Sequence, residues 1–236
     1  MNIFFITDEV PFKGRSGSSI VSWTWINFFL KQKHKIFIFI YPSRSVDLDK
    51  IFFKQAKKYK DIKNLEIFFL KKQKMQTSKE LFLPSLKRYL NIENEDDITK
   101  KLSEKIIYFK PDIFFLYGLF AIFISRNLNS IKRFAPMCEN PLRISLAKLK
   151  YQTNFKNFIF RIYDLYRSWF LMREISNIFN DCDLKGHSSE DFRKDFIKNG
   201  VKSIKYYNHP YPKVPYISKN QNYHLDKKIR LLIVGA

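Results

Sequence analysis

The sequence predicts an α/β protein with a Rossmann-like, doubly wound parallel sheet. Its candidate strands are short and almost wholly apolar, which indicates burial on both faces. Helical segments alternate with these strands, so each crossover is long enough for parallel pairing. A glycine-bearing loop at 7–17 joins the first strand to the first helix. Proteins of this fold class bind ligands at such loops, outside the carboxyl ends of the strands.

The first forty residues form a strand–helix–strand unit. Strands are expected at 2–6 and 36–40, with a helix over about 18–32 between them. We expect the Trp23 and Trp25 side chains to pack against the sheet, the alternative being an exposed stacking platform. Because free N–H groups point outward at a helix N-terminus, the glycine loop is a natural place for an anion.

The middle of the chain continues the alternation of helices and strands. Helices are expected at 48–59, 98–109 and 119–128, and strands at 65–70, 113–116 and 133–138. A short helical or irregular stretch covers 81–90, where Pro84 interrupts it. The acidic residues of 91–97 precede a helix, so we interpret them as favourable charge at its N-terminus, with metal binding as the alternative.

The segment 142–178 is strongly helical and rich in aromatic residues. Its wide apolar face is interspersed with Arg161, Arg167 and Arg173. One interpretation is a long core helix. The other is a partly exposed amphipathic face for a lipid-linked substrate or an anionic membrane surface.

The C-terminal part of the sequence suggests a domain boundary. The last elements of the first domain are a strand at 184–187, a serine-capped helix through 197 and a strand at 205–207. Residues 213–226 have the composition of a linker, and 227–236 predicts a new buried strand with a glycine turn. We therefore expect an N-terminal domain at 1–212, a linker at 213–226 and, at 227–236, the first strand of a second, truncated domain.

The formal net charge is +21, from 43 Lys and Arg against 22 Asp and Glu. Such charge attracts nucleic acid or an anionic membrane surface. However, Lys, Ile, Phe, Asn and Tyr are enriched together, as in AT-rich coding sequence, and the basic residues form no long block. No apolar run reaches the ~18–20 residues that span a bilayer, no signal-peptide pattern opens the chain, and Cys138 and Cys182 have no metal or redox spacing. We expect a cytoplasmic protein, either free or peripheral on the inner face of the plasma membrane.

Several short motifs, in order and at compatible spacing, are similar to those of one enzyme family. Ser16-Gly17 resembles a Gly-Gly pair that opens the family's first helix, and Lys33-His34 resembles the Gly-His pair at its end. Further similar stretches are Lys110-Pro111-Asp112 with Gly118, Asp183 with Ser188-Ser189, Tyr207-Asn208-His209-Pro210, and 231–235. Together they resemble the N-terminal half of a GT-B glycosyltransferase of the family 4 type, over nearly the whole chain.

The resemblance implies a transferase that moves a sugar from a nucleotide-sugar donor to a glycan or lipid-linked acceptor, in cell-surface polysaccharide synthesis. It implies no cofactor and no required metal, since the nucleotide-sugar is a co-substrate. In the family the second domain holds most of the donor. The 236-residue chain is therefore expected to be inactive alone.

The resemblance also implies roles for particular residues. The donor-phosphate residues would be Ser16, Gly17 and Ser18, and the acceptor-cleft residues would be Gly118, Asn140 and Arg143. A glycine loop before a helix N-terminus suits the phosphates, because backbone N–H groups can approach them. Near the reacting centre the family often has a histidine, where this chain has Met137-Cys138-Glu139-Asn140. Glu139 is therefore the catalytic candidate, the alternative being a solvated loop acid.

Two other classes of protein fit the sequence less well. A dinucleotide-binding enzyme expects G-x-G-x-x-G directly after the first strand and an acid at the end of the second. Here the Gly14-x-x-Gly17 spacing comes late, and 40–43 offers no acid. A nucleic-acid-binding module needs a focused basic patch with exposed aromatic residues. The lysines are scattered, so no nucleic-acid partner is expected.

Overall fold

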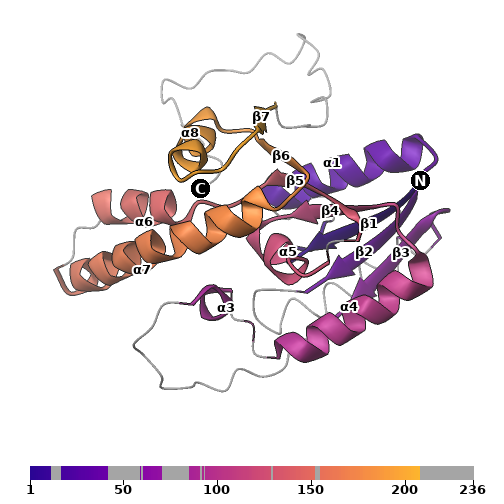
Figure 1. The fold of residues 1–236 in the computed structure, drawn as a ribbon, viewed down its shortest axis with the longest axis horizontal. Coiled ribbons are helices and arrows are strands. Elements are labelled where there is room, and N and C mark those ends of the chain that lie inside the picture. The colour runs from indigo at the N-terminus through magenta and orange to yellow at the C-terminus, as the bar shows by residue number, and fades with distance from the viewer. Residues whose placement is uncertain are drawn as a thin grey trace, which may run out of the picture.

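The protein folds as a parallel sheet with helices on both faces (Figure 1). The computed structural model describes residues 1–11, 17–41, 59, 61–70, 85–90, 92, 94–128, 130–151 and 155–207. The strands are β1 (Asn2–Thr7), β2 (Lys35–Ile40), β3 (Leu65–Phe69), β4 (Ile113–Tyr117), β5 (Lys132–Met137), β6 (Leu184–His187) and β7 (Ile204–Tyr206). The helices are α1 (Gly17–Lys31), α3 (Leu86–Tyr89), α4 (Glu95–Phe109), α5 (Leu119–Ile124), α6 (Pro141–Lys150), α7 (Phe155–Asn180) and α8 (Glu190–Lys198). Apart from Tyr59, the helix expected at 48–59 lies outside the described residues, as do the linker at 213–226 and the strand at 227–236.

The strand order explains how the chain builds the sheet. Within the described residues the order is β3-β2-β1-β4-β5-β6-β7, and every pair is parallel. Phe4 of β1 lies opposite Phe37 of β2 on one side and Phe114 of β4 on the other. The chain thus starts near the middle, winds to one edge, returns, and winds to the other. The predicted doubly wound parallel α/β fold is confirmed.

Alternate side chains of the central strands enter two separate cores. Phe4 and Ile6 face the core that includes residues of α4, α5, α7 and α8. Ile3 and Phe5 face the opposite core, which includes residues of α1. The Phe5 ring stacks on Phe115, with ring centroids 4.8 Å apart. Because both faces are covered, the strands are continuous apolar runs rather than alternating ones.

Helix α4 begins earlier than predicted because the acidic residues form its first turn. The Asn94 side chain caps the helix by accepting a hydrogen bond from the Asp97 N–H at 3.1 Å. Glu95, Asp96 and Asp97 occupy the first turn, where negative charge is favourable. This arrangement agrees with the interpretation of the acidic residues as a helix start. Helix α5 is shorter than predicted and ends at Ile124.

The aromatic segment forms two helices, not one. Helices α6 and α7 pack together, and the hydroxyls of Ser145 and Ser168 meet between them at 2.8 Å. In the C-terminal half of α7, Leu171, Ile175 and Phe179 are fully buried. The N-terminal half extends past the sheet (Figure 1). The buried half agrees with the interpretation as a core helix. The other half is exposed, and its role toward a lipid-linked substrate or a membrane stays a prediction. No described helix is long and apolar enough to cross a membrane.

Candidate active site

The carboxyl ends of β1, β4 and β5 meet at the point where the strand order reverses. β1 pairs with β2 on one side and β4 on the other, and β4 pairs with β5. Asp8 and Glu9 directly follow β1, and Gly118 directly follows β4. Glu139 lies two residues after the end of β5. In open α/β sheets ligands bind at this edge. Three acidic residues and one glycine therefore mark the expected ligand position.

Gly118 and Glu139 are in direct contact. Gly118 has φ 94° and ψ 166°, a conformation that is essentially restricted to glycine. A Cβ atom at this position would lie 3.0 Å from Glu139 Oε1 and 3.4 Å from Asp8 Oδ1. The Leu119 N–H, at the start of α5, donates a hydrogen bond to Glu139 Oε2. The glycine thus leaves room for a carboxylate that a free helix N–H holds in place.

The surroundings of Glu139 raise its pKa above the ordinary carboxyl value. Burial is the largest cause, and the nearby Glu9 carboxylate adds to it. Hydrogen bonds from the backbone N–H groups of Glu139 and Leu119 oppose this rise. Glu139 as a whole residue is partly exposed. Such a carboxyl exchanges its proton nearer neutral pH than an ordinary one, which suits general acid–base chemistry.

Tyrosine side chains lie within electrostatic range of Glu139. Burial is the main cause of the raised pKa of Tyr89 and of Tyr117, and the Glu139 charge contributes to both. Ser22 of α1 lies near the Tyr117 hydroxyl and partly offsets the rise of its pKa. The Tyr207 hydroxyl donates to the Pro136 carbonyl of β5. This bond fixes the end of β5, just before the carboxylate.

A buried histidine supports the backbone just before Glu139. The Ser189 N–H donates to His187 Nδ1 at 2.9 Å, and His187 Nε2 lies 3.2 Å from the Cys138 carbonyl oxygen. Since Nδ1 accepts, Nε2 carries the hydrogen and donates it to that carbonyl. His187 therefore links the end of β6 to the end of β5 and helps to position Glu139. This role of His187 was not predicted from the sequence.

Asn140 and Arg143, both predicted for the acceptor cleft, contact helix α8. The Asn140 side chain caps α6 by accepting from the Arg143 N–H at 3.0 Å, and its Nδ2 donates to Asp195 at 3.2 Å. The Arg143 guanidinium donates to both carboxylate oxygens of Asp195, at 2.6 Å from Nε and 3.2 Å from Nη2. These bonds join α6 to α8. The cleft role of both residues stays a prediction.

The predicted phosphate residues are described in part. Ser16 lies outside the described residues. Gly17 is exposed at the start of α1, and no atom lies within 4 Å of the position its Cβ would take. The Ser18 carbonyl accepts a hydrogen bond from Ser22 Oγ at 2.8 Å. No acidic residue occupies the first turn of α1. The phosphate role stays a prediction.

Asp8 and Glu9 belong to the site although the sequence analysis did not select them. The Glu9 N–H donates to Thr7 Oγ1 at 3.1 Å, which turns the chain as it leaves β1. Their position directly after the first buried strand was the available signal, since that strand lies at the switch point. Across the ranges that the structure describes, no three His, Cys, Asp or Glu side chains are grouped as a metal site.

Comparisons with known proteins give matches only among solved structures. No protein-family model and no curated protein matches this sequence. UGT89C1 of Arabidopsis thaliana, a UDP-glycosyltransferase, is among the matching structures. Its UDP-L-rhamnose complex aligns with a TM-score of 0.47 and 11% identity over 90% of this chain and 53% of that one. Its complex with UDP gives a TM-score of 0.46 and 14% identity, and its complex with quercetin gives 0.45 and 13%. The present chain spans about half the length of these structures.

Proposed function

We propose that this chain is the acceptor-side domain of a glycosyltransferase that uses a nucleotide-sugar donor. One observation carries the proposal: the Glu139 carboxyl, with a raised pKa, lies beside Gly118 at the switch point of the sheet. The GT-B-like motifs, in order along the chain, support it. The acceptor would be a glycan or lipid-linked glycan, as in the assembly of cell-surface polysaccharide.

In the proposed reaction an acceptor hydroxyl attacks the anomeric carbon of the donor sugar. The bond from that carbon to the diphosphate oxygen breaks, and the nucleoside diphosphate leaves with the bonding electrons. The hydroxyl proton passes to the Glu139 carboxylate. The raised pKa of Glu139 supports this assignment, because a carboxylate that binds its proton more tightly is a stronger base. Orientation of the acceptor at this edge supplies much of the remaining catalysis.

The donor diphosphate would face the N-terminus of α1. Gly17 is exposed there, and the first turn contains no acidic residue. Helix α8, by contrast, has Glu190 and Asp191 in its first turn. The free N–H groups and the helix dipole of α1 would stabilise the leaving diphosphate electrostatically, without a required metal. Ser16 and Ser18 would complete this phosphate side.

Nucleotide-sugar turnover tests the proposal. The chain is assayed with UDP-, GDP- and ADP-sugars and glycan acceptors, both alone and, as an extended form, fused to the donor-binding domain of a GT-B glycosyltransferase. We expect the extended form to release nucleoside diphosphate and the chain alone to be inactive. Glu139→Gln should lower the rate of the extended form at least ~100-fold, as for loss of a general base. Glu190→Gln, on α8 and paired with Arg193, is the matched control. A fully active Glu139→Gln would contradict the assignment.

A further inference from the structure

The N-terminal half of α7 presents an aromatic face to its surroundings. Six exposed side chains define this aromatic surface: Phe158, Phe160, Tyr163, Tyr166, Trp169 and Phe170. Most of them recur at helical spacing on one side of the helix. Phe160 is 71% exposed and Trp169 is 64% exposed. Beyond Phe170 the exposed residues are Arg173, Glu174 and Asn177, so the outward face becomes polar where α7 joins the core.

Helix α6 extends the aromatic surface with an apolar groove. The groove has a volume of about 370 Å³ and is lined by Leu142, Leu146, Ile162, Leu165, Tyr166 and Trp169. All six lining residues are apolar or aromatic. Surface grooves of this character mark interaction sites.

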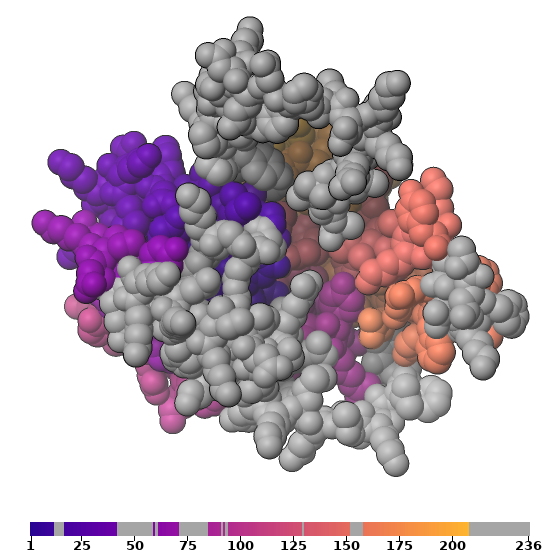
Figure 2. Space-filling model, turned by 180° about the vertical axis from the view of Figure 1, so that it is seen from behind, coloured from indigo at the N-terminus to yellow at the C-terminus, as the bar shows by residue number. Residues whose placement is uncertain are grey.

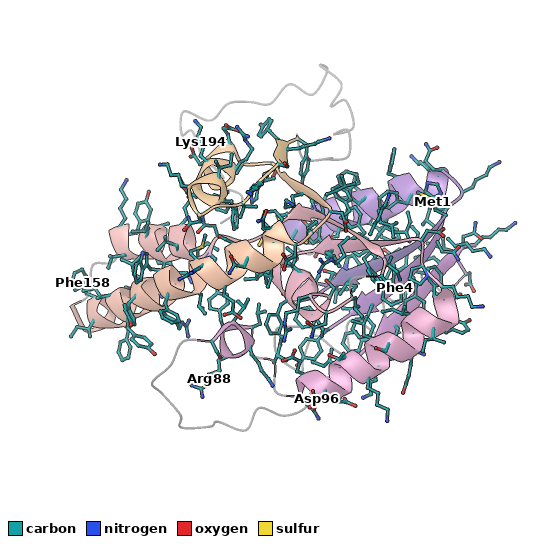
Figure 3. All side chains as sticks on the ribbon, viewed as in Figure 1. Met1, Phe4, Arg88, Asp96, Phe158 and Lys194 are labelled. Carbon is teal, nitrogen blue, oxygen red and sulfur yellow. The ribbon has the colours of Figure 1, made fainter. Side chains whose placement is uncertain are left out.

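The aromatic surface lies away from the sheet. Phe158 is at the far end of α7, distant from the Phe4 side chain in the sheet (Figure 3). Seen from behind, α6 and α7 (salmon to orange) lie on the opposite side of the molecule from the N-terminal elements in indigo and purple (Figure 2). The part of α7 from 155 to 170 measures roughly 24 Å at 1.5 Å per residue. The α6–α7 hairpin therefore offers a projecting surface.

Basic side chains accompany the aromatic ones. Residues 141–180 contain seven Lys and Arg against two Asp and Glu. Arg143 pairs with Asp195 of α8, so six basic residues against two acids remain, a balance of +4. Lys148 and Lys150 are exposed on α6. Of the two acids, Asp164 already pairs with Arg161 at 3.4 Å and with Arg167 at 3.5 Å. The surface that remains is apolar and positively charged.

We propose that the α6–α7 aromatic surface docks on an anionic phospholipid bilayer. Aromatic rings settle at the boundary between headgroups and acyl chains, while Lys and Arg reach the anionic headgroups. The groove can take hydrocarbon. A second copy of the chain fits less well, because a two-fold interface would set the same positive surface against itself. Helix α6 begins two residues after Glu139, so the docking hairpin is directly connected to the candidate active site.

Vesicle flotation tests this proposal without any need for turnover. The chain is mixed with phosphatidylcholine vesicles, with and without phosphatidylglycerol. We expect binding to the anionic vesicles only, and a blue shift of the exposed Trp169 fluorescence. The triple variant Phe158→Ser/Tyr166→Ser/Trp169→Ser should bind about tenfold less, through lost apolar contact with the membrane.

Two further variants distinguish specific membrane binding by the aromatic surface from non-specific hydrophobic adsorption of the protein. Lys148→Glu/Lys150→Glu should also bind about tenfold less, because each basic residue near an anionic surface contributes to attraction. Ile107→Ser/Tyr108→Ser is the matched control, since these α4 side chains are 73% and 67% exposed, and its binding should be unchanged. Equal binding to neutral and anionic vesicles, or undiminished binding by the triple variant, would overturn the proposal. Light scattering that shows a dimer which the triple variant abolishes would assign the surface to a second copy instead.

Discussion

Replacing Gly118 by alanine tests whether the Gly118–Glu139 contact organises the carboxyl edge. The backbone at Gly118 has φ 94° and ψ 166°, and holding alanine there costs about 1–3 kcal/mol. The new Cβ would also lie 3.0 Å from Glu139 Oε1, so the carboxylate must shift by a few tenths of an ångström, which strains the hydrogen bond from the Leu119 N–H to Oε2. A hydrogen bond to a charged group contributes about 1.5–3 kcal/mol, and we expect the shift to forfeit about 1–2 kcal/mol of it. We therefore expect Gly118→Ala to lose about 2–5 kcal/mol of unfolding free energy.

Two other glycines separate the backbone cost from the contact. Gly200 has φ 87° with nothing within 4 Å of its Cβ position, so Gly200→Ala should lose only the backbone cost of about 1–2 kcal/mol. Gly17 begins α1, also with nothing within 4 Å of that position. Gly17→Ala should therefore be neutral or stabilising by up to about 1 kcal/mol.

Urea denaturation of the three variants and the parent measures these differences. For a chain of this length about 1 kcal/mol corresponds to roughly 2–4 °C in Tm, so Gly118→Ala should melt roughly 4–20 °C below the parent. A Gly118→Ala variant no less stable than Gly200→Ala would refute the reasoning. It would mean that the Glu139 carboxylate moves aside at no cost.

Three further predictions concern the same region. Because the folded state raises the Glu139 pKa, it keeps that proton to higher pH than the unfolded chain does. The unfolding free energy of the parent should therefore fall as pH rises from the ordinary carboxyl pKa to the raised one. Urea denaturation at a series of pH values should show this fall, and Glu139→Gln should not show it. Gly186→Ala would place a Cβ 2.8 Å from the Tyr207 ring and should cost about 1–3 kcal/mol, less when Tyr207→Leu is added; equal cost in both backgrounds would contradict this contact. A double-mutant cycle of Arg143→Met with Asp195→Asn should give a coupling free energy of about 1 kcal/mol. This coupling should weaken with salt, since both side chains are partly exposed (39% and 26%). Absence of coupling would show that solvent screens the ion pair completely.

The strands were predictable because their signal is local. The runs at 2–6 and 36–40 are apolar in sequence, and burial on both faces requires nothing else. Helix ends were less predictable. Helix α4 starts at Glu95 because its acids lie inside the first turn rather than before it. Helix α5 stops at Ile124, where the apolar run gives way to Ser125, although the helix was predicted to continue to 128.

Some site residues were also predictable from the sequence, whereas others were not. Glu139 was predicted as a catalytic candidate, and it lies at the expected edge of the sheet with a raised pKa. Asp8 and His187 were missed because their contacts join residues far apart in sequence. Arg143 was predicted for the cleft, but its guanidinium is bonded to Asp195, 52 residues away. No periodicity in the sequence reports such a contact.

The sequence by itself determined the fold class, the order of strands and helices, and the presence of an acid after β5. Those features follow from apolar periodicity and turn chemistry, which act over a few residues. Only the tertiary structure decided that Gly118, Glu139 and Asp8 come together, and which half of α7 is exposed. Both outcomes depend on how strands pair and where the sheet ends beneath a long helix, and these are properties of the packed chain rather than of any segment.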